Sequence, residues 1–202
     1  MKNTIAIIDY GMGNLRSVQK AFENVGALAK ITHSAADILN ADKVVLPGVG
    51  AMGPAMQKLN ELGLVGAIRK VTSDKKPFLG ICLGLQLLFQ RSSEGGFVEG
   101  LKILEGSVER FASLKVPHMG WNQINVQAAG KKLCAGIKSG DNVYFCHSYF
   151  IKPTDTSIIA TSTNYGIDYA SAIVSGNIWG MQFHPEKSQK IGLQLLKNFV
   201  EL

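Results

Sequence analysis

Cys82 is the residue whose surroundings most favour chemistry. It lies in the segment Gly80–Gly84 (GICLG), between an apolar run over residues 77–81 and an apolar helical stretch over residues 83–90. A G-x-nucleophile-x-G segment at a strand-to-helix junction is typical of a nucleophile elbow, whose tight turn leaves no room for side chains two positions away. The first N–H groups of the following helix would stabilise a thiolate. The alternative is a buried, inert cysteine, and the flanking glycines favour the nucleophile.

A thiol nucleophile needs a base and a group that orients the base. His184 follows an apolar run over residues 178–183, so it is expected at a strand end, where catalytic groups of α/β sheets gather. Glu186 could accept the imidazole N–H and fix its tautomer. The same pattern also fits a turn histidine beside an acid that caps a helix. His147 cannot pair with its neighbour Cys146, because neighbours on a strand point to opposite faces.

Two glycine-rich segments also follow apolar runs. Residues 47–50 (PGVG) could supply backbone N–H donors to an oxyanion, although a simple strand-to-helix turn has the same composition. Residues 10–14 (YGMGN) suggest a dinucleotide-binding loop, but Arg16 stands where the third glycine is required. The sequence therefore gives little support for a nucleotide cofactor.

The elements that must position these residues alternate over the first ninety positions. Short apolar runs predict strands over residues 4–9, 28–32, 43–46 and 77–81. Apolar residues three or four positions apart predict helices over residues 14–25, 51–71 and 83–90. Buried strands that alternate with helices indicate a parallel sheet covered on both faces.

The second half changes character. Short apolar runs separated by turn residues predict antiparallel hairpins added to the sheet, over residues 103–111, 121–126, 142–151, 157–163, 170–174 and 178–183. The tail, Ser188–Leu202, suits a closing helix. We expect one α/β domain over residues 1–202, with a mixed, mostly parallel sheet flanked by helices.

Composition limits the classes of protein that the chain can represent. Of its 202 residues, 46% are hydrophobic and 18% are charged, which excludes a disordered chain. The net charge of +6 is spread over short basic runs, so it indicates a solvated surface, not a nucleic-acid site. No apolar run approaches the roughly 18 residues of a membrane span. The start, MKNTIAIID, reads as a first strand and not as a signal peptide.

Cysteine usage indicates the compartment. Cys82, Cys134 and Cys146 make an odd number without CxxC spacing. That pattern argues against a disulfide framework and against a zinc site. A reducing cytoplasm is the simplest setting, and we expect neither a metal nor a cofactor.

Three segments, in this order along the chain, resemble the class I (triad) glutamine amidotransferases. They are PGVG at 47–50, GICLGLQLL at 80–88 and HPE at 184–186. The resemblance implies a flavodoxin-like fold and hydrolysis of glutamine. It implies Cys82 as nucleophile, His184 as base and then acid, and Glu186 as the group that orients the histidine. Further implied roles are oxyanion donation by the backbone N–H of Leu83 and by one in Gly48–Val49, and glutamine contacts by Gln86, Ser148 and Tyr149.

Within this class the chain is similar to the glutaminase subunits of imidazole glycerol-phosphate synthase. The similar segments span the whole chain: IDYGMGNLRSV, LPGVGAMGPAM, PHMGWN, YFCHSY and FHPEKS. The resemblance implies a heterodimer with a (βα)₈-barrel cyclase that consumes the ammonia in histidine biosynthesis. It places Asn14, Trp121 and Lys187 at the partner interface. Two positions depart from the expected pattern: Cys146, which we interpret as a packing change, and Asn164, which puts no catalytic residue in doubt.

Other interpretations remain open from the sequence. A related subunit could serve another synthase, such as those of anthranilate, aminodeoxychorismate, pyridoxal phosphate or surface-sugar assembly. A non-catalytic scaffold or a redox sensor could share the fold. A thiol hydrolase of the dienelactone type fits less well, because its acid precedes the histidine along the chain.

Overall fold

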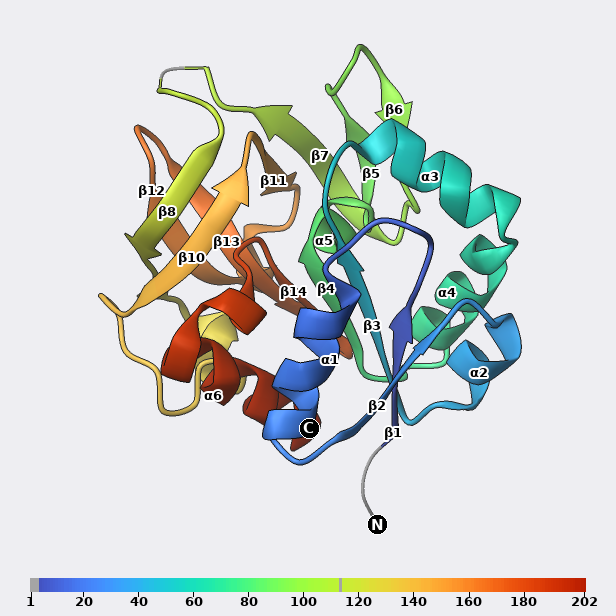
Figure 1. Cartoon of the computed structure of the whole chain (residues 1–202). Helices are drawn as coiled ribbons and strands as arrows, with labels where there is room; N and C mark the ends of the chain where they lie inside the picture. Colours follow the sequence, from blue (N-terminus) through green and yellow to red (C-terminus); the bar gives the residue numbers. More distant parts are fainter. Residues whose placement is uncertain (1–3, 113) are drawn as a thin grey trace.

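Five parallel strands form the part of the main sheet that carries Cys82 (Figure 1). The computed structural model describes residues 4–112 and 114–202. Across the sheet the order is β2 (Leu28–Thr32), β1 (Thr4–Ile8), β3 (Lys43–Gly48), β4 (Phe78–Cys82) and β14 (Ile178–Met181). β14 comes from the far end of the chain and pairs in parallel with β4, so Met181 lies opposite Ile81. This pairing brings the segment before His184 beside the strand that ends at Cys82.

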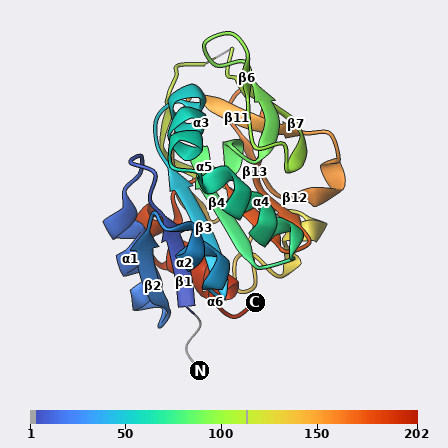
Figure 2. The ribbon, with the colours of Figure 1, turned by 90° about the vertical axis from the view of Figure 1, so that its right-hand side faces the viewer.

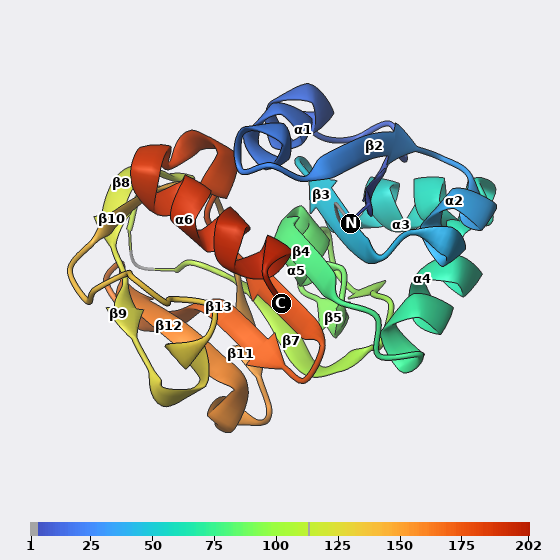
Figure 3. The same cartoon turned by 90° about the horizontal axis from the view of Figure 1, so that it is seen from below.

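Helices cover both faces of these strands because successive strand residues point to opposite sides. Ile5 and Ile7 of β1 pack in the cluster of buried residues contributed by α1 (Leu15–Asn24) and α6 (Gln189–Val200). Ala6 and Ile8 belong to the cluster on the other face. The helices of that face are α2 (Ala35–Asn40), α3 (Met52–Glu61) and α4 (Leu64–Ser73), which lie in front of the sheet in Figure 2 and opposite α1 and α6 in Figure 3.

Two helical predictions are corrected by the structure. The stretch expected over residues 51–71 is two helices, because Gly63 adopts φ 66° at the break between them. The helix expected over residues 83–90 stops at Gln86, which leaves the one-turn helix α5 (Leu83–Gln86). Beyond it, the carbonyls of Leu87 and Leu88 accept hydrogen bonds from the backbone of residues 101–104. These hydrogen bonds to a distant segment of the same chain replace the bonds that would continue the helix.

The sheet continues with antiparallel pairs beyond β14. Its neighbours in order are β13 (Asp168–Ser175), β11 (Tyr149–Pro153), β7 (Leu104–Arg110), β5 (Phe89–Ser92) and β6 (Val98–Glu99), and only β5 and β7 among them pair in parallel. Two further strands extend the sheet from β13: β12 (Ile159–Asn164) pairs with β13, and β9 (Asn125–Val126) pairs with β12. The structure confirms the predicted α/β class with a mixed sheet.

One predicted hairpin does not join this sheet. β8 (His118–Gln123) and β10 (Asn142–His147) form a separate two-stranded sheet, with Trp121 opposite Tyr144. The apolar run expected over residues 142–151 is divided at Ser148, where the chain passes from β10 of the small sheet into β11 of the large one. The small sheet therefore stands at one side of the cavity described below.

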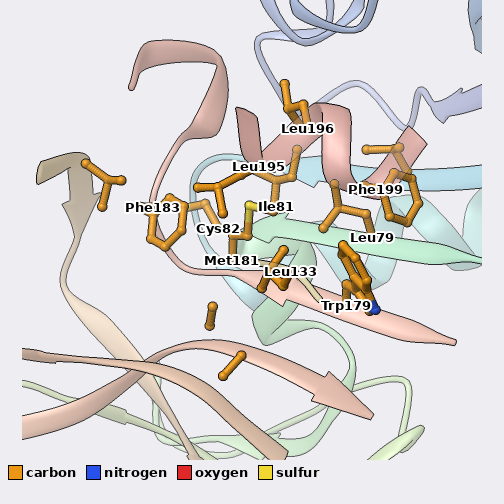
Figure 4. Close-up of a cluster of buried hydrophobic side chains, with 14 of the residues drawn as sticks. Leu79, Ile81, Cys82, Leu133, Trp179, Met181, Phe183, Leu195, Leu196 and Phe199 are labelled. Carbon is orange, nitrogen blue, oxygen red and sulfur yellow. The ribbon is translucent and has the colours of Figure 1, made fainter. Parts of the chain in front are cut away.

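The closing helix α6 packs on two adjacent strands of the main sheet. Its residues Leu195, Leu196 and Phe199 pack on Leu79 of β4 and Trp179 of β14 (Figure 4). Phe199 and Trp179 have ring centroids 5.8 Å apart. In the described part of the chain, no helix combines the length and apolar character that a membrane crossing needs.

Candidate active site

Cys82 occupies a strained backbone conformation at the end of β4. Its φ of 53° and ψ of −109° lie in a region that L-residues rarely adopt, at a cost on the order of 1–3 kcal/mol. The strand before it and the helix α5 after it hold the residue there, as in a nucleophile elbow. Figure 4 shows its side chain beside the core residues Ile81 and Met181. Cys82 thus belongs to the buried core and also lines a cavity.

The glycines around Cys82 are required by close packing. A Cβ on Gly80 would lie 2.8 Å from the backbone nitrogen of Leu85. A Cβ on Gly84 would overlap the carbonyl group of Leu46 on β3. The elbow can therefore form only where both flanking positions lack a side chain.

His184 and Glu186 lie directly after β14. His184 Nδ1 and Glu186 Oε1 are 2.9 Å apart, and both side chains are almost fully buried. The His184 backbone is held as well, because its N–H donates to Tyr144 O at 2.9 Å and its carbonyl accepts from the Ser188 hydroxyl at 2.7 Å. With Nδ1 engaged, Nε2 is the ring nitrogen that is left to act on a substrate.

Electrostatics favour a charged imidazole. Burial disfavours the imidazolium, but Cys82 and Glu186 outweigh burial and raise the pKa of His184 to about 10. A histidine that holds its proton at neutral pH can give that proton to a leaving group. Cys82 and Glu186 together keep the imidazole protonated.

Cys82 and His184 share a cavity of about 270 Å³. Its wall includes several predicted site residues, namely Val49, Leu83, Gln86, Ser148, Tyr149 and Lys187. Gly48 lies opposite Cys82 in the parallel register of β3 and β4. The PGVG segment is in turn packed against the YGMGN segment, because a Cβ on Gly50 would lie 2.9 Å from Met12 Cε.

Gln86 and Gln182 form a buried pair behind the nucleophile. Gln86 Nε2 donates to Tyr149 O at 2.9 Å and to Gln182 Oε1 at 3.0 Å. Gln182 Nε2 donates to Cys82 Sγ at 3.7 Å. Gln86 therefore spends its amide hydrogens on the protein, which leaves Oε1 as its atom for a ligand. Gln182 was missed by the sequence reasoning, although a glutamine inside the apolar run over residues 178–183 was a signal.

Glu94 was also missed. Its carboxylate accepts the backbone N–H of Met52 at 2.7 Å, and the residue lines the cavity together with Cys82 and His184. It lies after β5, in a loop that continues with Gly95 and Gly96. An acid in a glycine-containing loop carries no recognisable signal, because only the fold brings that loop to the cavity.

The remaining histidines of this region belong to a neutral network. His118 Nδ1 lies 3.3 Å from His147 Nε2, and His147 Nδ1 donates to Tyr149 O at 2.8 Å. Burial lowers the pKa of His147 to about 3 and that of His118 to about 4. Both imidazoles are uncharged at neutral pH, so His184 is the histidine suited to acid–base chemistry here.

The residues predicted at a partner interface lie in two places. Trp121 is 49% exposed and packs edge-to-face on Tyr144, with ring centroids 6.0 Å apart. Lys187 Nζ lies 5.7 Å from the centre of the same Tyr144 ring. Asn14 begins α1, where its carbonyl accepts the N–H of Val18. Met119, 62% exposed on β8, belongs to the same rim as Trp121 and was not foreseen.

Comparisons with known proteins agree with this geometry. The family model described as "Glutamine amidotransferase class-I" matches residues 6–202. A protein of Moorella thermoacetica named "Imidazole glycerol phosphate synthase subunit HisH" is 53% identical over 199 residues, which cover 98% of this chain and 94% of that protein. A protein of Aquifex aeolicus with the same name is 52% identical over 195 residues, covering 96% of this chain and 94% of its own length.

Solved structures show the same fold at low sequence identity. One, titled "Crystal structure of glutamine amidotransferase", has a TM-score of 0.76 at 17% identity and covers 98% of this chain and 99% of its own. The glutaminase domain of Trypanosoma brucei CTPS with bound acivicin has a TM-score of 0.67 at 13% identity, covering 99% of this chain and 94% of its own. The family match and the identity over nearly the whole length place the chain in the class-I glutamine amidotransferase family, among the HisH subunits of imidazole glycerol phosphate synthase.

Proposed function

We propose that this chain releases ammonia from glutamine with Cys82 as nucleophile, His184 as base and then acid, and Glu186 as the group that orients the histidine. The observation that carries the proposal is that Cys82, in its strained backbone conformation, lines the same cavity as His184. The buried carboxylate of Glu186 contacts that histidine. Residues 1–202 act as one glutaminase domain. Its unpaired cysteines fit the cytoplasm as its compartment.

The reaction runs through a thioester. Cys82 Sγ attacks the side-chain amide carbon of glutamine, and the amide oxygen becomes an oxyanion. Backbone N–H groups of Leu83 and of the Gly48–Val49 segment stabilise that oxyanion, each worth ~2.7–4 kcal/mol in the barrier. His184 protonates the leaving nitrogen, so ammonia departs. Water, activated by His184, then attacks the thioester, and glutamate leaves as Cys82 is restored.

The cavity offers complementary groups to the rest of the glutamine molecule. The carboxylate of Glu94 and the free Oε1 of Gln86 suit its α-ammonium group. Ser148 and Tyr149, at the break between β10 and β11, suit its α-carboxylate through their N–H and hydroxyl groups.

Ammonia needs a receiving site, because in water it becomes ammonium, which is not nucleophilic. The receiving protein is a (βα)₈-barrel cyclase, which combines ammonia with a phosphoribulosyl-formimino carboxamide nucleotide in histidine biosynthesis. The relatives' name, which describes a subunit of imidazole glycerol phosphate synthase, supports this partner. Met119 and Trp121 are exposed apolar groups beside the cavity rim that suit a docking surface. Asn14 and Lys187 complete that surface.

The decisive experiment separates ammonia production from its use. A complex of the cyclase with Cys82→Ala should form no imidazole product from glutamine. The same complex should form it from ammonium salt at alkaline pH, because external ammonia then reaches the cyclase directly. If the complex stays inactive with ammonium, the proposed division of labour is wrong.

A second variant tests the docking surface. Lys187→Ala should still release glutamate but should couple fewer of those turnovers to imidazole product, because it weakens a rim contact and leaves the thiol intact. Glutamate and imidazole product are measured side by side in the same reaction. Unchanged coupling would remove Lys187 from the interface.

A further inference from the structure

A backbone carbonyl fixes the direction of the two amides beside Cys82. A carbonyl oxygen can only accept, so the Gln86 atom 2.9 Å from Tyr149 O is the donor Nε2. The same nitrogen lies 3.0 Å from Gln182, so the Gln182 atom that faces it is the acceptor Oε1. The other end of the Gln182 amide, Nε2, then faces Cys82 Sγ at 3.7 Å. The three contacts together permit one orientation only.

The second lone pair of the Tyr149 carbonyl is also occupied. His147 Nδ1 donates to it at 2.8 Å, so this nitrogen carries the proton. His147 Nε2 is then an acceptor that faces His118 Nδ1 at 3.3 Å, and Asn122 Nδ2 lies 3.2 Å from His118 Nε2. Each group in this chain therefore donates to the next: Asn122 to His118, His118 to His147, and His147 to the Tyr149 carbonyl. With both lone pairs engaged, the Tyr149 carbonyl holds the Gln86 amide in one orientation.

The buried amide of Gln182 uses both of its ends, because its oxygen accepts from Gln86 and its nitrogen donates to Cys82. Its side chain is fully buried directly after β14. A buried amide that lost its partners would destabilise the fold, whereas an apolar residue would not. One of its two hydrogen-bond partners is the sulfur of Cys82. That contact points to chemistry as the reason for an amide at this position.

We propose that Gln182 is a further catalytic residue, whose amide N–H stabilises the negatively charged sulfur of Cys82, and that Gln86 and the Tyr149 carbonyl position this N–H. The inference rests on the proposed role of Cys82. The sulfur is negative before it attacks glutamine. It becomes negative again when the intermediate of thioester hydrolysis collapses, because the C–S bond breaks and its electron pair returns to sulfur. In the thioester itself the sulfur is neutral, so the N–H favours the two events in which charge appears on sulfur, namely formation of the thiolate and collapse of the hydrolysis intermediate.

Other groups lie near the same sulfur or line its cavity, and Gln182→Met leaves all of them in place. Tyr10 after β1, Tyr169 on β13 and His184 after β14 interact electrostatically with Cys82. The carbonyl of Cys146 on β10 lies 4.0 Å from its sulfur. The cavity is also lined by Glu94 after β5, His147 on β10 and Lys187 after β14, and Glu186 contacts His184. Gln182 differs from the charged groups because it supplies a neutral donor that does not titrate.

The test measures alkylation of Cys82 by iodoacetamide in the full chain over a range of pH, read at the Cys82 peptide by mass spectrometry. Gln182→Met keeps the length of the side chain and removes the donor. We expect the pH profile of alkylation to move upward, so that on its rising part the variant reacts up to about tenfold more slowly than the wild type. Gln182→Glu, which turns a carboxylate oxygen toward sulfur, should slow it further. Glutamate release should lose kcat by a similar factor with little change in KM.

A matched control separates catalysis from packing. Asn198→Leu removes another buried amide, on α6, which donates to Leu133 O at 2.8 Å and Ala135 O at 2.9 Å and, in the described part of the chain, makes no hydrogen bond to Cys82. It should lower thermal stability without moving the alkylation profile. A Gln182→Met profile that coincides with the wild-type profile would overturn the role of Gln182. If alkylation of wild-type Cys82 leaves glutamate release intact, the proposed nucleophile itself is wrong, which is a distinct outcome.

Discussion

The two walls of the cavity are built in different ways. The wall formed by β3, β4 and α5 depends on backbone geometry, because Gly80 and Gly84 allow Cys82 to occupy its strained turn. The wall formed by β10, β11 and the segment after β14 depends on side-chain hydrogen bonds that run through Tyr149 O and Gln182. The first wall should therefore lose its fold when a methyl group is added to one of its glycines. The second should lose its side-chain arrangement when a hydrogen-bond donor or acceptor is removed.

The largest effect is expected in the second wall. His184→Ala should reduce kcat for glutamine hydrolysis by about 10⁴-fold or more, because no other group replaces the acid and base. Glu186→Gln should reduce kcat by a factor about two orders of magnitude smaller, since an amide oxygen can still accept from His184 Nδ1. Steady-state glutamate release by the two variants tests this order. Equal losses would show that Glu186 has a second role, such as docking the partner.

The same substitution in two helices tests the first wall. Gly84→Ala should lower the free energy of unfolding by at least about 3 kcal/mol, because the new Cβ meets the Leu46 carbonyl. Gly66→Ala, in α4, meets nothing within 4 Å and should raise it by ~0.5–1 kcal/mol. Chemical denaturation measures both. A tolerated Gly84→Ala would mean that the elbow does not need this close approach.

The charge of the second wall should appear in the pH dependence of stability. The folded-state pKa of His184, about 10, is above its ordinary value of 6.5. The protonated histidine therefore contributes its full stabilisation below pH 6.5 and loses it as pH rises through about 10. The difference in Tm between wild type and His184→Ala should shrink across that window. A difference that is constant with pH would contradict a charged His184.

The smallest effect concerns a hydroxyl behind the first wall. Tyr10 is buried against Gly48, and its hydroxyl has no hydrogen-bond partner among the residues that the structure describes. Tyr10→Phe should leave the free energy of unfolding unchanged or raise it by up to ~1 kcal/mol, because an unsatisfied group is removed. Tyr169→Phe should lower it by ~1 kcal/mol, since the Tyr169 hydroxyl contacts His118 and His147 at 3.3 Å. Matching losses in both variants would indicate a hidden partner for Tyr10.

Local patterns predicted much of the first wall. The apolar runs of β1, β2, β3 and β4 were placed within a few residues, because a buried strand is a short apolar segment wherever it occurs. GICLG predicted a turn that only glycines permit. In the second wall, HPE predicted a histidine beside an acid. Both are properties of neighbours in the chain, so the sequence carries them directly.

The second wall could not be predicted in the same way. Gln182 and Cys82 are separated by 100 positions, Gln86 and Gln182 by 96, and Gln86 and Tyr149 by 63. The early end of α5 likewise depends on residues more than ten positions later, because the backbone of residues 101–104 donates to the carbonyls that follow α5.

The sequence by itself predicted Cys82 as the nucleophile and the strand and helix that flank it, because turn geometry and strand burial are encoded within a few neighbouring positions. The tertiary structure decided which donor reaches the sulfur, which carboxylate enters the cavity, and that β8 and β10 leave the main sheet. These outcomes depend on pairing between distant strands. A hydrogen bond has direction and short range, so its partners are known only when those strands are in place.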